Sequence, residues 1–87
     1  MEKKDVANWL VINLSKVLDI NVNDIDQSLQ FEDYGLDSIT AVGLVGELAQ
    51  WLKQELDPSI IYDYPSIDFL SEYIVEELFI KTPQTLE

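Results

Sequence analysis

Residues 37–53 read DSITAVGLVGELAQWLK, and this stretch decides the expected fold because its apolar residues follow a helical period. At about 100° per residue, five apolar side chains gather on one side of such a helix. They are Ala41, Leu44, Val45, Leu48 and Leu52. We therefore expect a helix from Asp37 or Ser38 to about Lys53, with this side packed against a core.

The same stretch has a second apolar side, nearly opposite the first, formed by Ile39, Val42, Gly43 and Gly46. A small domain cannot easily bury both sides, so we expect this one to face solvent and to suit a docking partner. Each mid-helix glycine costs about 0.5–1 kcal/mol relative to alanine, which indicates close approach of a partner or of a neighbouring helix. Exposed apolar residues are also common without any docking role.

Helical spacing predicts further helices on both sides of this one. The first runs from about Asp5, a candidate cap, to Leu18, and its core residues are Val6, Leu10, Leu14, Val17 and Leu18. Turn-forming residues then predict a long connector over 19–29. We expect apolar residues to hold it to the core: Ile20, Val22, Ile25 and Leu29, with Phe31 and Tyr34 as further anchors.

The C-terminal third predicts a short helical turn over 56–64 and a last helix from Ile67 to about Phe79, capped by Ser66. The buried side of that last helix is expected to hold Ile67, Leu70, Ile74 and Leu78. The expected class is all-α, with one domain over residues 1–80. We expect a flexible tail over 81–87.

The composition excludes several functions. Seventeen acidic residues against five basic ones give a formal net charge of −12, which disfavours binding to nucleic acid or to an anionic membrane. The chain has no Cys and no His, so it lacks a disulfide framework and the usual zinc ligands. The acidic segment 24–37 lacks the spacing of a calcium-binding EF-hand loop, so no metal site is expected. We expect a cytoplasmic monomer.

Ser38 is the residue with the clearest chemical potential. A serine nucleophile needs a base to take its proton, and no His is present, so we expect no catalytic residue in this chain. Helix capping by Asp37 and Ser38 is one interpretation of the pair. The other is that Asp37 caps the helix while Ser38 points outward and is modified by another enzyme. A phosphate group there would be favoured by the helix N-terminus.

The ordered motifs of the whole chain resemble those of acyl carrier proteins. Phe31 is followed by Tyr34-Gly35-Leu36-Asp37-Ser38-Ile39, and downstream by Tyr62-Asp63-Tyr64-Pro65-Ser66-Ile67. The resemblance covers about Val6 to Phe79. It implies a four-helix bundle with a short third helix and a long loop between the first two helices. It also implies that Ser38 receives 4′-phosphopantetheine from a phosphopantetheinyl transferase, and that the arm carries acyl groups as thioesters.

The resemblance also concerns the cargo and the partners. Asp37, Ile39, Val42, Gly43 and Gly46 match positions that carrier partners commonly touch. Leu36 stands where peptidyl carriers usually have glycine, and the second helix is less acidic than in carriers of fatty-acid synthesis. Polyketide or mixed polyketide–peptide biosynthesis is therefore favoured, with downstream synthase or tailoring enzymes as partners. Residues 41–52 and 58–65 look most like carriers loaded by a fatty acyl-AMP ligase.

Three alternatives stay open at this point: a fatty-acid-synthesis carrier, a peptidyl carrier, and a helical interaction module that is never modified. Trp9 and Trp51 are either partner anchors or half-buried residues at the core edge.

Overall fold

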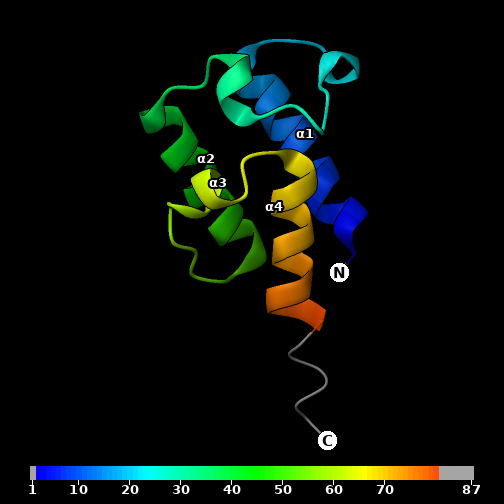
Figure 1. Cartoon of the computed structure of the whole chain (residues 1–87), viewed down its shortest axis with the longest axis vertical. Coiled ribbons are helices and arrows are strands. Elements are labelled where there is room, and N and C mark those ends of the chain that lie inside the picture. The colour runs from blue at the N-terminus through cyan, green and yellow to red at the C-terminus, as the bar shows by residue number, and fades with distance from the viewer. Residues whose placement is uncertain (1, 81–87) are drawn as a thin grey trace, which may run out of the picture.

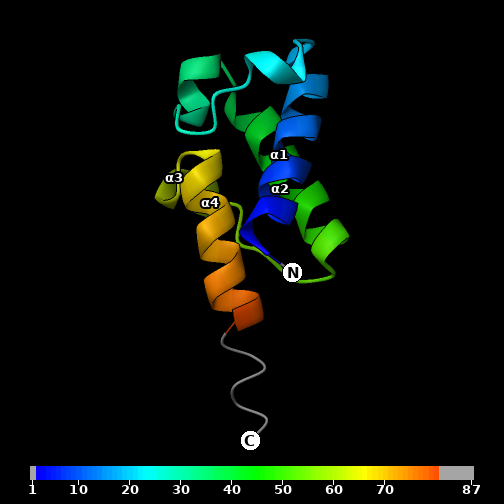
Figure 2. The same ribbon diagram turned by 90° about the vertical axis from the view of Figure 1, so that its right-hand side faces the viewer.

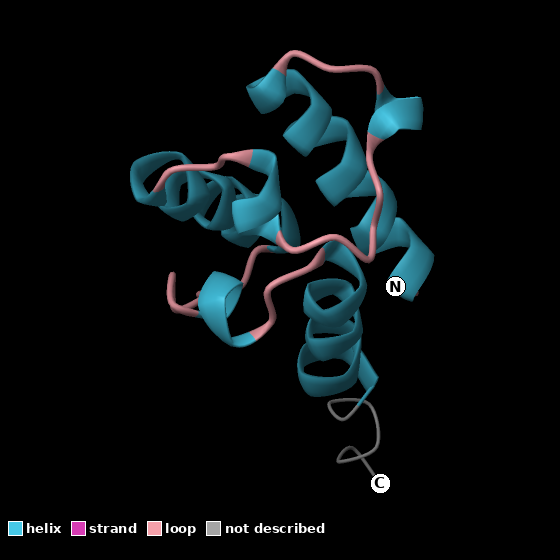
Figure 3. Ribbon diagram, turned by 45° about the horizontal axis from the view of Figure 1, so that its top comes forward, coloured by secondary structure: helices cyan, strands magenta, loops and turns pink. Residues whose placement is uncertain are grey.

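The structure is a computed structural model that describes residues 2–80, and the side chains of residues 79 and 80 are not described. Four helices form it: α1 (Lys3–Leu18), α2 (Ser38–Leu52), α3 (Ile60–Asp63) and α4 (Ile67–Ile74). No strand occurs among the described residues, which agrees with the predicted all-α class with a short third helix (Figure 3). The predicted tail, 81–87, lies outside the described residues.

The helices pack around one apolar core. α1 runs upward in Figure 1, whereas α2 and α4 run downward beside it. All five residues predicted for the packed side of α2 are buried, as are Ile67, Leu70 and Ile74 of α4, while Leu78, beyond the end of α4, is partly buried. These predictions are confirmed. They succeed because the spacing of apolar residues in a helix indicates which side faces the core.

The first helix ends at Leu18, as predicted, but it starts earlier than predicted and buries a different residue in its last turns. It begins at Lys3, and Asp5 is not its cap: Asp5 Oδ2 accepts a hydrogen bond from the Glu2 amide at 2.9 Å, one turn inside the helix start. Val17 was expected in the core but is 46% exposed, whereas Ser15 is buried. Burial of Ser15 is possible because its hydroxyl donates to the Ile12 carbonyl at 2.7 Å.

The long connector between α1 and α2 lies over one end of the bundle, at the top of Figure 2. It includes two short 3₁₀ turns, η1 (Val22–Asp24) and η2 (Phe31–Tyr34). Phe31 is buried, and Tyr34 and Ile25 pack against the core, as predicted. The prediction is wrong for the other apolar residues, because Ile20, Val22 and Leu29 are each more than a third exposed.

Main-chain hydrogen bonds fasten the connector instead. The Phe31 amide donates to the Pro65 carbonyl at 2.7 Å, and the Asp68 amide donates to the Gln27 carbonyl at 3.0 Å. Both bonds join the connector to the start of α4, where Ser66 Oγ caps the helix by accepting from the Phe69 amide. The connector and the start of α4 therefore form one unit.

The last helix is shorter than predicted as a regular α-helix. α4 ends at Ile74 and continues as a π-helical segment, η3 (Val75–Ile80). Elsewhere, the two tryptophans stack on each other, with ring centroids 5.4 Å apart and planes at 18°. Trp9 is partly buried against the core and Trp51 is 39% exposed, which supports the interpretation of a core-edge pair.

Candidate functional site

The first turn of α2 exposes a serine. Ser38 is the first residue of the helix, and Asp37 before it is the cap, because Asp37 Oδ1 accepts from the Thr40 amide at 2.8 Å. That hydrogen bond from the Thr40 backbone, with a smaller one from its side chain, lowers the pKa of Asp37 below its ordinary value. Ser38 is exposed, and its hydroxyl makes no hydrogen bond within residues 2–80.

Of the two interpretations of this pair, the structure agrees with the one in which Asp37 caps the helix and Ser38 points outward. The aspartate satisfies the helix start, and the serine hydroxyl stays accessible. The positive end of the helix dipole and the first-turn amides at this position favour a phosphate ester. The residues present thus fit a phosphate-linked group on Ser38 Oγ.

A tight turn at Gly35 comes just before this serine in the chain. Gly35, at the end of η2, has φ +79°, a left-handed conformation that glycine adopts without the strain of a side chain. Its amide donates to the Glu32 carbonyl at 3.0 Å. The direction in which α2 starts therefore depends on the residues that hold η2 in place.

The side of α2 next to Ser38 faces solvent, as predicted. Ile39 is 84% exposed and Val42 is 43% exposed. Gly43 and Gly46 lie on open surface, because no atom stands within 4 Å of the position of an added Cβ at either residue. The two glycines therefore do not serve the approach of a neighbouring helix of this domain. We call this surface, Ile39, Val42, Gly43 and Gly46, the smooth face.

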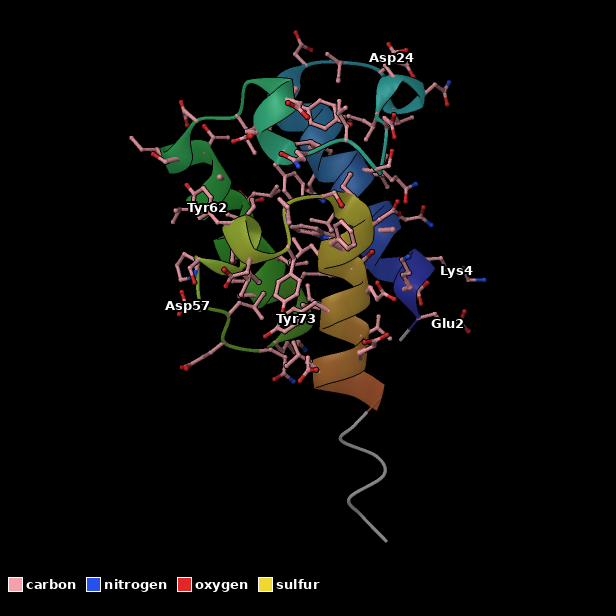
Figure 4. The ribbon with its side chains drawn as sticks, in the orientation of Figure 1. Glu2, Lys4, Asp24, Asp57, Tyr62 and Tyr73 are labelled. Atoms are coloured by element: carbon pink, nitrogen blue, oxygen red, sulfur yellow. The ribbon has the colours of Figure 1, made fainter. Side chains whose placement is uncertain are left out.

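A cavity of about 240 Å³ lies beside the start of α2. Its apolar lining comes from η2, α2, α3 and the loops that follow η2 and α3: Phe31, Leu36, Ala41, Ile61, Tyr62 and Pro65. Tyr62 is 62% exposed and lies next to the first turns of α2 in Figure 4. Tyr62 is not among the site residues predicted from the sequence, although an aromatic residue in the predicted short turn over 56–64 was the signal available.

The part of the sequence that contains Ser38 is acidic and has no basic residue close to it. Between Lys16 and Lys53 the chain has seven acidic residues and no basic one: Asp19, Asp24, Asp26, Glu32, Asp33, Asp37 and Glu47. Among residues 2–80 the one ion pair is Lys4–Glu2, at 3.9 Å and far from Ser38 in the sequence. The described residues include no cluster of three or more His, Cys, Asp or Glu side chains that would hold a metal ion. Nor does any helix in this range combine the length and apolarity needed to cross a membrane.

Comparisons with known proteins show the family to which the chain is similar. Residues 8–74 match the sequence family described as "Phosphopantetheine attachment site". The acyl carrier protein TtuC of Teredinibacter turnerae is 37% identical over 71 residues, which cover 82% of each chain. Polyketide synthase PksL of Bacillus subtilis is 33% identical over 73 residues, which are 84% of this chain and 2% of that synthase.

A similar solved structure is a free-standing peptidyl carrier protein from Acinetobacter baumannii. It superposes with a TM-score of 0.84 at 36% identity, over 88% of this chain and 96% of that one. The relatives thus include proteins described as acyl, polyketide-synthase and peptidyl carriers.

Proposed function

The chain belongs to the family of phosphopantetheine-binding carrier domains, and we propose that Ser38 is the residue to which its 4′-phosphopantetheine arm is attached. Domains of this family are non-catalytic, are modified by a phosphopantetheinyl transferase and work with synthase enzymes. The arm supplies a terminal thiol that carries the cargo as a thioester. The observation that supports Ser38 is its exposed, unpartnered hydroxyl at the start of α2.

Attachment forms one bond and breaks one. The Ser38 oxygen bonds to the phosphorus that carries pantetheine in coenzyme A, and the phosphoanhydride to the nucleotide half breaks. The nucleotide leaves with the bonding electron pair, and the serine proton passes to the transferase or to solvent. With no His in the chain, the transferase has to supply the base.

Intact-mass measurement tests this assignment. The purified protein is incubated with coenzyme A, Mg²⁺ and a transferase of broad specificity, and we expect the mass of one phosphopantetheinyl group to be added. Ser38→Ala should give no adduct, whereas the control Ser59→Ala, which changes another exposed serine before a helix, should be modified fully. An unmodified wild type would favour the interaction module, and an adduct on Ser38→Ala would move the site elsewhere.

We further propose that the cargo is a fatty acid loaded by an acyl-AMP ligase, within polyketide or mixed polyketide–peptide biosynthesis. Support comes from the smooth face, where a partner meets apolar and glycine surface with Glu47 as the one acidic residue of α2. An interface of this kind depends on shape and burial more than on charge. Asp37, at the edge of the smooth face, supplies a negative charge beside the attachment point.

Ligase assays on the arm-bearing protein test the docking surface. With ATP and a free fatty acid, we expect acylation of the wild type and a rate about tenfold or more lower for Val42→Asp and Gly43→Glu, because a charge is buried in an apolar contact. Ile12→Asp is the matched control, since Ile12 on α1 is 47% exposed against 43% for Val42. Equal rates for Val42→Asp and Ile12→Asp would place docking elsewhere. Loading by an amino-acid-activating enzyme instead would identify a peptidyl carrier.

A further inference from the structure

The hydroxyl of Tyr34 binds both main-chain groups of a single residue in the connector. Tyr34 Oη accepts a hydrogen bond from the Asp26 amide at 2.7 Å and donates one to the Asp26 carbonyl at 2.5 Å. Asp26 is itself held in one conformation, because its Oδ1 accepts from the Ser28 amide at 2.9 Å and from Ser28 Oγ at 2.7 Å. The phenol thus joins two residues that are eight positions apart in the sequence with two hydrogen bonds, and we call this contact the Tyr34 clasp.

The Tyr34 clasp, the pair of hydrogen bonds between Tyr34 Oη and Asp26, lies directly before the turn that leads to Ser38. Tyr34 is the last residue of η2, and Gly35 follows it with its left-handed backbone. The other end of the clasp is fixed as well, because the Gln27 carbonyl next to Asp26 accepts from the Asp68 amide of α4. The Tyr34 hydroxyl therefore links the Gly35 turn to the start of α4 through the connector.

We propose that Tyr34 is a positioning residue for modification of the carrier: its hydroxyl fixes the Gly35–Asp37 turn, so that Ser38 is presented to the transferase in one orientation. This inference rests on the proposed attachment at Ser38. Tyr34 itself does not touch the reacting atoms. Without the hydroxyl, the ring still packs against the core, but the turn at Gly35 samples more directions.

The expected kinetic effect follows from the population of the competent conformation. If only a fraction of the free carrier holds Ser38 correctly, the apparent affinity for the transferase falls by that fraction. Losing the net effect of an ordinary hydrogen bond corresponds to about a two- to tenfold change in that population. The KM for the carrier should rise by this factor in Tyr34→Phe, while kcat stays near the wild-type value because bound carriers are all competent.

The control is Tyr73→Phe, which removes a hydroxyl that makes no hydrogen bond within the described range while leaving the ring stacked on Tyr64. For each protein we would measure KM and kcat with the transferase, Tm, and the hydrogen exchange rate of the Thr40 amide. Both Asp26 groups bound by Tyr34 are exposed to solvent, so water replaces the phenol and Tm should change little.

The outcomes separate cleanly. A higher KM with faster Thr40 exchange in Tyr34→Phe alone supports the positioning role. An unchanged KM, or a rise shared with Tyr73→Phe, overturns it. A large fall in Tm with normal KM for the folded protein also overturns it, because Tyr34 would then act on stability alone. If the wild type gains no arm at Ser38, the failure belongs to the proposed function and not to Tyr34.

Discussion

At the scale of single residues, Asp37 joins the fold to the function. Its carboxylate completes the first turn of α2 through Thr40, and it lies next to the exposed Ser38 hydroxyl. Because the aspartate serves as cap, the serine is not needed for that task. The charge of Asp37 is a separate property from its capping oxygen, so the two contributions can be measured apart.

We expect Asp37→Asn and Asp37→Ala to separate those contributions. Asparagine keeps a capping oxygen, so the Tm of Asp37→Asn should stay near that of the wild type, whereas Asp37→Ala should lower it. Both variants lose the charge, and kcat/KM with the transferase should fall about two- to fivefold, the factor of an exposed ion pair. Normal kinetics in Asp37→Asn would mean that the transferase does not read this charge.

The same cap predicts a pH dependence. The hydrogen bond from Thr40 lowers the pKa of Asp37 from 3.8, so folding favours the ionised form. A lowered pKa contributes stability that is complete above the ordinary pKa and is lost as the pH falls through the lowered value. The Tm difference between wild type and Asp37→Ala should therefore be constant near neutral pH and should shrink below about pH 3.8. Because the neutral acid keeps a capping oxygen, as Asp37→Asn does, part of the difference remains in strong acid. A difference that does not shrink at all would contradict the role of the ionised carboxylate.

At the scale of elements, two mid-helix glycines on the exposed side of α2 make this helix less stable than alanine would. Gly43 and Gly46 have open space where a Cβ would stand, so Gly43→Ala and Gly46→Ala meet no clash. Each should stabilise the fold by about 0.5–1 kcal/mol and raise Tm by roughly 2–8 °C. Ala49→Gly in the same helix is the control and should lower Tm. Unchanged Tm values in both alanine variants would show that helix propensity does not limit this element.

The elements also show what the sequence can and cannot predict. The packed side of α2 was predictable residue by residue, because a regular helix repeats its burial pattern. The connector has no such period, so Ile20, Val22 and Leu29 were wrongly expected in the core. It is held by main-chain amides of Phe31 and Asp68 and carbonyls of Pro65 and Gln27, groups that almost every residue type has, since only proline lacks the amide proton. For the same reason, the sequence could not predict that the Tyr34 hydroxyl binds the backbone of Asp26.

The site divides in the same way. Ser38, Asp37 and the smooth face all follow from the pattern of residues 37–46, and they lie where the pattern places them. Tyr62 reaches the site from α3 through the fold, and no spacing rule connects it to α2. The boundary between carrier domain and tail, near residue 80, stays a prediction.

At the scale of the whole molecule, negative charge is spread almost without compensation. The formal net charge is −12, and no basic residue occurs between Lys53 and Lys81. On α4, Asp68 and Glu72 are four residues apart, a spacing at which like charges repel by a few tenths of a kcal/mol. Self-repulsion of this kind destabilises the compact state. The same net negative charge attracts basic partners and so speeds their encounter with the protein.

Ionic strength should therefore change stability and partner encounter in opposite directions. Raising NaCl from about 0.01 M to 1 M shortens the screening length from about 30 Å to 3 Å, so repulsion within the fold weakens and Tm should rise by several degrees. The association rate with a basic transferase should fall over the same range, because the attraction is screened too. Glu72→Gln removes one repelling charge on α4 and should raise Tm at low salt more than at high salt. If Tm is the same at both salt concentrations, the charge is too dispersed to oppose folding, and only the association rate should respond to salt.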